Sequence, residues 1–137
     1  MLIRYSLLCF VVASPLAMAV QFEEGEWQTE VRIEFNGAMF PVPFTTERCL
    51  SPQDPIPNTT ANNANCKISD VSDTDSELGW TLHCDDAKGS LHGVGGITFK
   101  GNGFTGTMKM EIRDDEGELQ NQHRYHMTGF RKGPCKE

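Results

Sequence analysis

The residues that could do chemistry in this 137-residue chain are mainly its cysteines and histidines. One cysteine, Cys9, lies in an apolar N-terminal stretch, and four follow it: Cys49, Cys66, Cys84 and Cys135. An even number of cysteines in an exported chain is typical of a disulfide framework. Structural zinc is the alternative, but no two of these cysteines have the close spacing, about two to four residues, that zinc sites usually show. The pattern therefore predicts two disulfides.

The four histidines give no clear metal or catalytic site. His123 and His126 are three residues apart, which places them on opposite faces of a strand. His83 and His92 lie on the polar faces of neighbouring predicted strands and could sit diagonally close. We expect ordinary surface histidines, and no bound metal.

Carboxylates and serines also fail to form a recognisable site. Two turns, within 70–77 and 114–118, are crowded with Asp and Glu, but neither has the spacing of a calcium-binding loop. No serine occupies a Gly-x-Ser-x-Gly elbow, and no glycine-rich run leads into a helix that could hold phosphate. The sequence therefore predicts a protein that is not an enzyme, with no catalytic residues and no cofactor.

The first 19 residues have the three parts of a secretory signal peptide. Arg4 supplies the positive charge, the following stretch to Leu16 is mostly apolar, and Ala17-Met18-Ala19 has small residues where a signal peptidase cleaves. A membrane-spanning helix would need about 20 apolar residues, and this run is shorter. We expect cleavage near Ala19, a single domain over residues 20–137, and a periplasmic or secreted location.

The net charge of −7 limits the partners of the protein. An acidic surface repels nucleic acid phosphates and anionic lipid headgroups. We therefore expect no nucleic acid partner, and the apolar pattern gives no membrane span.

Alternating apolar and polar residues predict strands along almost the whole remaining chain. Residues 27–35 alternate cleanly and are followed by an Asn36-Gly37 turn. Residues 40–48 form a second extended stretch, which must be an edge or irregular strand because Pro41 and Pro43 cannot donate to a ladder. Residues 50–65 have no hydrophobic period and form the longest predicted loop.

Residues 66–84 are predicted to form a hairpin around the turn at 73–76. Folding there places Cys66 opposite Cys84, and opposite residues in a hairpin lie about 4.5–5.5 Å apart, within reach of a disulfide. We therefore pair Cys66 with Cys84 and, by elimination, Cys49 with Cys135.

Three further strands, at about 91–99, 104–112 and 119–130, bring the total to about seven. Antiparallel strands with such short connections predict an all-β fold, either a strongly curved meander or a small up-and-down barrel. Glycines inside the strands indicate sharp bends or close backbone approach; they are Gly93, Gly95, Gly96 and Gly106.

The largest apolar side chains share the predicted inner face of the sheet. Methionine adapts to irregular surfaces, so these residues could line a pocket for an apolar small molecule, although a packed core is the favoured interpretation. They are Trp27, Trp80, Phe99, Phe104, Met108, Met110, Tyr125 and Met127.

Several motifs together resemble one bacterial exported family. They are Gly25-Glu26-Trp27, Cys49-Leu50-Ser51-Pro52, Cys66-Lys67, the strand Trp80 to Cys84, the stretch Gly103 to Met110, and the ending Gly129 to Cys135. In this order they resemble the family called domain of unknown function 3617 (DUF3617), from which Pro134 is a modest departure. The resemblance implies an envelope location and brings no reaction, ligand or catalytic residue.

Three function classes remain, of which an enzyme is the weakest, and the other two are the expectations. The first is a non-catalytic binding or accessory protein of the cell envelope, holding an apolar small molecule. The alternative is a protein–protein module, such as an inhibitor of an envelope enzyme, that uses the loop at 50–65, since loops on rigid scaffolds often carry recognition.

Overall fold

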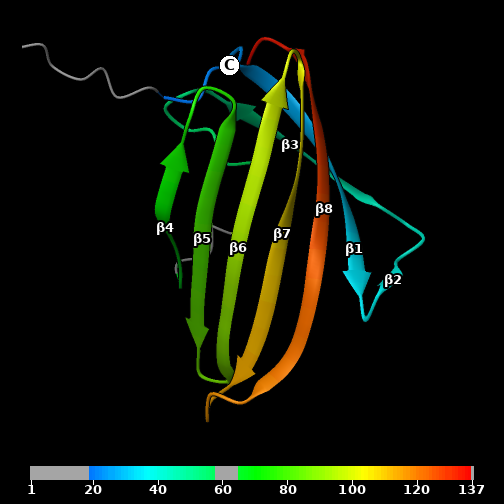
Figure 1. Ribbon diagram of the computed structural model, residues 1–137, viewed down its shortest axis with the longest axis vertical. Coiled ribbons are helices and arrows are strands. Elements are labelled where there is room, and N and C mark those ends of the chain that lie inside the picture. The colour runs from blue at the N-terminus through cyan, green and yellow to red at the C-terminus, as the bar shows by residue number, and fades with distance from the viewer. Residues whose placement is uncertain (1–18, 58–64, 137) are drawn as a thin grey trace, which may run out of the picture.

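The computed structural model describes residues 19–57 and 65–136, which form one antiparallel sheet of eight strands (Figure 1). The predicted signal peptide therefore lies almost wholly outside the described residues. The strands are β1 (Gly25–Phe35), β2 (Ala38–Met39), β3 (Phe44–Leu50), β4 (Cys66–Asp73), β5 (Glu77–Asp86), β6 (Gly89–Lys100), β7 (Gly103–Asp114) and β8 (Leu119–Gly133).

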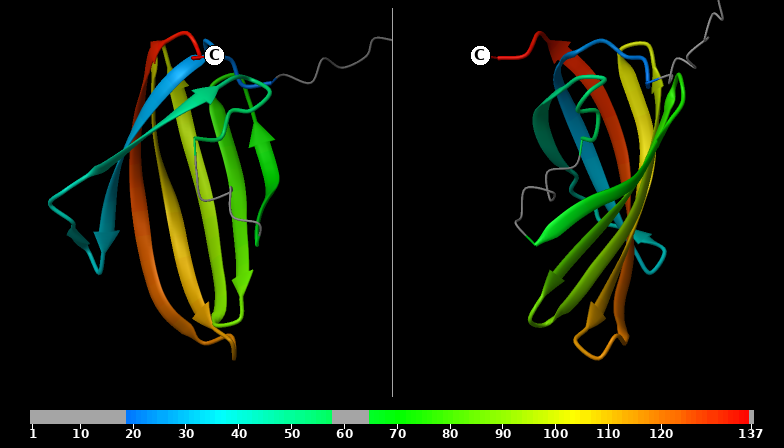
Figure 2. Two further views of the ribbon diagram at one scale, coloured as in Figure 1. Left: turned by 180° about the vertical axis from the view of Figure 1, so that it is seen from behind. Right: turned by 90° about the vertical axis from the view of Figure 1, so that its left-hand side faces the viewer.

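The strand order confirms the predicted curved meander and decides against a closed barrel. Strands β4 to β8 follow one another across the sheet, β8 pairs with β1, and both β2 and β3 pair with the far edge of β1. The two outer edges, β3 and β4, are not paired with each other, so the sheet is open. Figure 2 shows its strong twist from the side.

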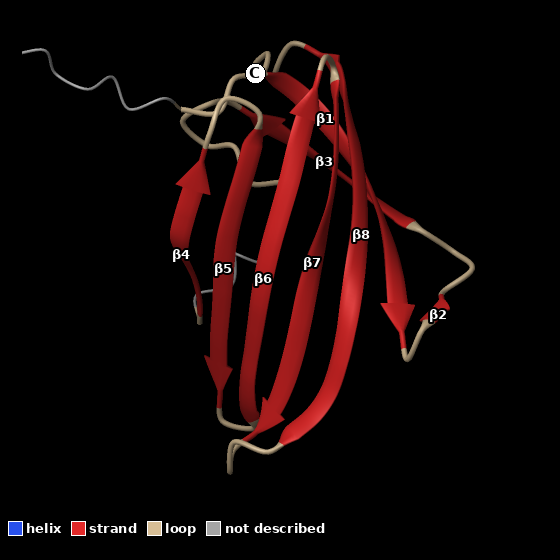
Figure 3. Cartoon of the chain, viewed as in Figure 1, coloured by secondary structure: helices blue, strands red, loops and turns tan. Residues whose placement is uncertain are grey.

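All the regular secondary structure in the described ranges is β-strand, and loops connect the strands (Figure 3). These ranges contain no helix with the length and apolarity that a membrane crossing requires. The expected edge strand near the prolines is confirmed, although it begins later than predicted. Residues 40–43 leave the sheet, and β3 pairs with β1 only from Phe44 onward.

Glycines allow large side chains to lie close against the sheet. A Cβ at Gly95 would lie 2.5 Å from Cε2 of Trp80, so the indole covers that glycine. Met108 and Met110 cover Gly93 in the same way, each with an atom 2.7 Å from the position of its Cβ. Gly93 and Gly95 are therefore positions of close approach, as the sequence predicted, whereas the nearest atom to a Cβ at Gly96 would be 3.7 Å away.

The core lies on the inner face of the sheet and is closed at one end by the segment before β1. There Phe22 stacks on Phe99 with ring centres 4.3 Å apart and meets the edge of Trp27 at 5.7 Å. Val20 is fully buried beside them. The chain that would follow signal-peptide cleavage is thus part of the core.

Both predicted disulfides are present. Cys66 and Cys84 face each other across β4 and β5, and Cys49 at the end of β3 is joined to Cys135 after β8. The second bond links the edge of the sheet to the C-terminal segment. The two bonds therefore secure opposite edges of an open sheet.

Candidate functional site

The eight predicted pocket residues are core residues. Seven of them are at most 5% exposed, and Tyr125 is half-buried. Trp27 packs against Phe99 and Phe104, with ring centres 5.7 Å and 5.8 Å away. None of the eight lines the pockets described below.

A pocket of about 470 Å³ continues the inner face beyond this core, at the end of the sheet where β5 turns into β6. Its floor is one cross-strand row that contains the Cys66–Cys84 disulfide, Leu91 and Ile112. On the inner face this row comes after the rows that contain Trp80 and Leu82. Its side chains are smaller than the indole of Trp80, and they leave the space above them unfilled. The floor is therefore apolar.

The rim of this pocket is polar, and several of its charged groups have partners. Arg113 donates to Glu111 at 3.3 Å and to the carbonyl oxygen of Gly117 at 3.1 Å. Asp86 accepts a hydrogen bond of 2.7 Å from the backbone N–H of Lys88. Since the rim carries Asp85 and Asp86 beside Lys88 and Arg113, its formal charges balance. This arrangement suits an uncharged, largely apolar small molecule.

A second pocket, of about 520 Å³, lies by the β1–β2 turn and the start of β8. Its lining is mostly polar and comes from residues 34–37, Lys109 and 119–124. Few apolar side chains face it, so it offers little area for burying an apolar ligand.

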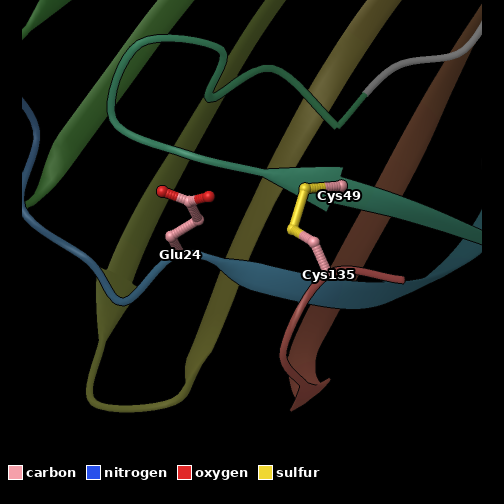
Figure 4. Close-up of side chains that lie close together, drawn as sticks. All are labelled: Glu24, Cys49 and Cys135. Carbon is pink, nitrogen blue, oxygen red and sulfur yellow. A yellow bond between two sulfur atoms is a disulfide. The ribbon is translucent and has the colours of Figure 1, made fainter. Parts of the chain in front are cut away.

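Glu24 lies beside the Cys49–Cys135 disulfide (Figure 4), and their ligand-type atoms are within 4.8 Å of one another. Cysteine binds metals as the thiolate, and these two sulfurs are bonded to each other. The group is therefore a disulfide with a neighbouring carboxylate, and it cannot coordinate a metal through thiolates in this state.

Two of the four histidines, His83 and His92, lie closer together than the sequence indicated. His83 and His92 are directly opposite each other on β5 and β6, rather than diagonal, and their ring centres are 6.2 Å apart. His123 and His126 lie on opposite faces of β8, as predicted, and His126 bonds Glu34 of β1 at 2.6 Å.

Comparison with known protein families gives a match for this chain. The family model described as "Protein of unknown function (DUF3617)" matches residues 22–135. The chain belongs to this DUF3617 family. No curated protein and no solved structure gives a significant match.

Two features of this DUF3617 protein were missed from the sequence. One is the pocket floor, for which the row of small and medium-sized side chains around Leu91 and Ile112 was the available signal. The other is an exposed apolar corner, defined here as residues 39–44, from the end of β2 to the start of β3. In this corner Met39, Phe40 and Phe44 are 44–52% exposed and Val42 is 79% exposed. Two prolines between apolar residues were its signal, since they keep this segment out of the sheet.

One titration should be visible in the stability of this DUF3617 protein. Burial lowers the pKa of His123, so the unfolded chain takes up a proton there before the folded protein does. Stability is therefore complete above about pH 6.5 and declines as the pH falls through and below that value. In melting curves between about pH 7.5 and pH 5, His123→Gln should lose less stability on acidification than wild type. His92→Gln, on the exposed outer face, is the control and should follow wild type; an unchanged profile for His123→Gln would contradict the assignment.

Proposed function

We propose that this protein is an exported, non-catalytic binding protein of the cell envelope that holds a small apolar molecule in the pocket beside the Cys66–Cys84 disulfide. The observation that carries the proposal is the pocket itself. It combines an apolar floor with a charge-balanced rim at the open end of a rigid sheet. Ligand sites are typically concave and mostly apolar, with a few polar groups that fix orientation.

Export is supported by the signal-like N-terminus and by the two disulfides. Disulfides persist in oxidising compartments and are rare in reducing ones. The first described residues are consistent with this proposal, because Val20 and Phe22, which follow the expected cleavage position near Ala19, pack in the core. An envelope compartment is therefore part of the proposal.

Native mass spectrometry of protein purified from the periplasm tests this function. We expect a co-purified small molecule on the wild-type protein, and its loss from Leu91→Trp, whose indole would occupy the pocket. The matched control is Val94→Trp, because Val94 lies three residues along β6 on the outer face and is 54% exposed. Both variants should melt close to wild type. A ligand retained by Leu91→Trp, or absent from wild type, contradicts the proposal.

The apolar corner favours a second candidate, a protein–protein module. Figure 2 shows the segment between β2 and β3 projecting from the sheet, and four large apolar side chains are exposed on it. Contiguous exposed apolar surface often marks an interaction site. A second polypeptide in the same mass spectra, lost from Phe40→Ser, would support this alternative. The loop first expected to carry recognition lies partly at 58–64, outside the described residues.

A further inference from the structure

The outer face of the sheet carries a pair of histidines in a geometry that suits a metal ion. His83 on β5 and His92 on β6 are directly opposite in the ladder, and Figure 1 shows the two strands side by side. Opposite side chains on one face start about 4.5–5.5 Å apart at Cβ. Their rings meet edge to face, with centres 6.2 Å apart.

This separation is close to what a shared ion requires. Two imidazoles that bind one zinc ion, each through an N–Zn bond of about 2.0–2.1 Å, have ring centres roughly 5 Å apart. His83 is 46% exposed in its side chain and His92 is also exposed, so both rings can rotate without disturbing packed neighbours. A difference of about 1 Å is within reach of such rotations.

A carboxylate already orients one of the rings. Nε2 of His83 lies 3.0 Å from Oδ2 of Asp85, two residues along the same strand and on the same face. This contact leaves Nδ1 of His83 as the nitrogen for a metal. In metal sites the ligating histidine commonly donates its other ring N–H to a carboxylate, which fixes the tautomer and makes the ligand more basic.

The charges around the pair allow a cation. Lys67 on β4 is paired with His83, and its positive charge disfavours a bound cation. Glu111 on β7 is paired with His92, and its negative charge favours one. Glu111 is held by Arg113 at 3.3 Å and by Gln122 at 3.4 Å, so it stays beside the pair. With Asp85, the neighbours of the pair supply two carboxylates, against the ammonium group of Lys67 and the guanidinium of Arg113.

We propose that His83 and His92 form a surface site for a borderline divalent transition metal such as Zn²⁺ or Cu²⁺. Imidazole nitrogens are suitable ligands for these ions, whereas Ca²⁺ prefers oxygen ligands. Asp85 is a positioning residue that holds His83, and water fills the remaining coordination positions. The two histidines lie on the opposite face from the pocket floor, and Asp85 also lies at the pocket rim. The metal site does not depend on the function proposed above.

Calorimetric titration of the oxidised protein with ZnCl₂ tests the site. We expect one equivalent of bound Zn²⁺ and no binding of Ca²⁺. His83→Asn and His92→Asn should each weaken Zn²⁺ binding at least tenfold, and Asp85→Asn by roughly tenfold, the range for loss of a partner that orients a ligand. His126→Asn is the matched control, because that outer-face histidine bonds Glu34 and should leave binding unchanged.

A structural readout separates ligation from a change in folding. On addition of Zn²⁺, the ring signals of His83 and His92 should shift in NMR spectra, while those of His123 and His126 should not. Wild-type affinity in both His83→Asn and His92→Asn would overturn the proposal. So would Zn²⁺ binding that is lost in Glu24→Gln, since it would place the ion at the Cys49–Cys135 group instead.

Discussion

Replacing both Cys49 and Cys135 with serine should lower the free energy of unfolding by about 4 to 5 kcal/mol. The bond joins residues 86 apart in sequence and closes a loop that contains most of the sheet. Cross-linking so long a loop removes much conformational entropy from the unfolded chain, which is the main stabilising effect in the chain-entropy model. Urea unfolding followed by tryptophan fluorescence, with reductant absent, measures the loss.

The shorter disulfide is the matched control. The Cys66–Cys84 bond joins residues only 18 apart, so the corresponding double serine variant should lose about 3 kcal/mol. The expected result is therefore an order: the variant without Cys49–Cys135 unfolds at the lower urea concentration. The reverse order would show that local packing around Cys66–Cys84, rather than loop length, decides the contribution of each bond.

The sequence predicted the Cys66–Cys84 disulfide because two local signals agreed. Period-two alternation indicated the strands, and folding at 73–76 placed Cys66 opposite Cys84. In the structure the ladder reaches this register through an irregularity between Ser69 and Ser72. The pairing of the first long strand, β1, with the last strand, β8, had no such local signal. The contact of β1 with β8 joins residues about a hundred positions apart, and nothing in either strand alone specifies that partner. Its register is set by packing of the inner face, for example Val31 opposite Met127.

The candidate site was predicted less well than the fold, for a physical reason. Large apolar residues on one face were correctly placed together, but a pocket forms where side chains are too small to fill the space. Leu91 and Ile112 are unremarkable in sequence, and only their position beyond the last large core residues leaves a cavity. The direct pairing of His83 with His92 likewise depends on register, since a shift of one residue would place the two side chains on opposite faces.

Replacing a strand glycine should be severe where a neighbouring backbone lies close to it, and Gly106 gives the sharpest test. A Cβ there would lie against the carbonyl oxygen of Gly96 and 2.7 Å from Cα of Ile97. Both are backbone atoms of the neighbouring strand, so no change of rotamer can relieve the contact. Gly106→Ala should therefore cost about 3 kcal/mol or more, the upper end for an added methyl group in a packed core.

Gly96→Ala separates this steric effect from the general effect of replacing a strand glycine. Gly96 lies in β6 next to Ile97, which is the ladder partner of Gly106, but the nearest atom to its Cβ would be the carbonyl oxygen of Leu78 at an ordinary 3.7 Å. With no clash, the smaller entropy of the unfolded alanine variant should leave stability equal to wild type or up to about 1 kcal/mol higher. In urea unfolding, Gly106→Ala should therefore show a large loss of unfolding free energy, and Gly96→Ala should show no change or a small gain. If Gly106→Ala were as stable as Gly96→Ala, the strands would have room to separate there, and the close backbone contact at Gly106 would not be a constraint on this sheet.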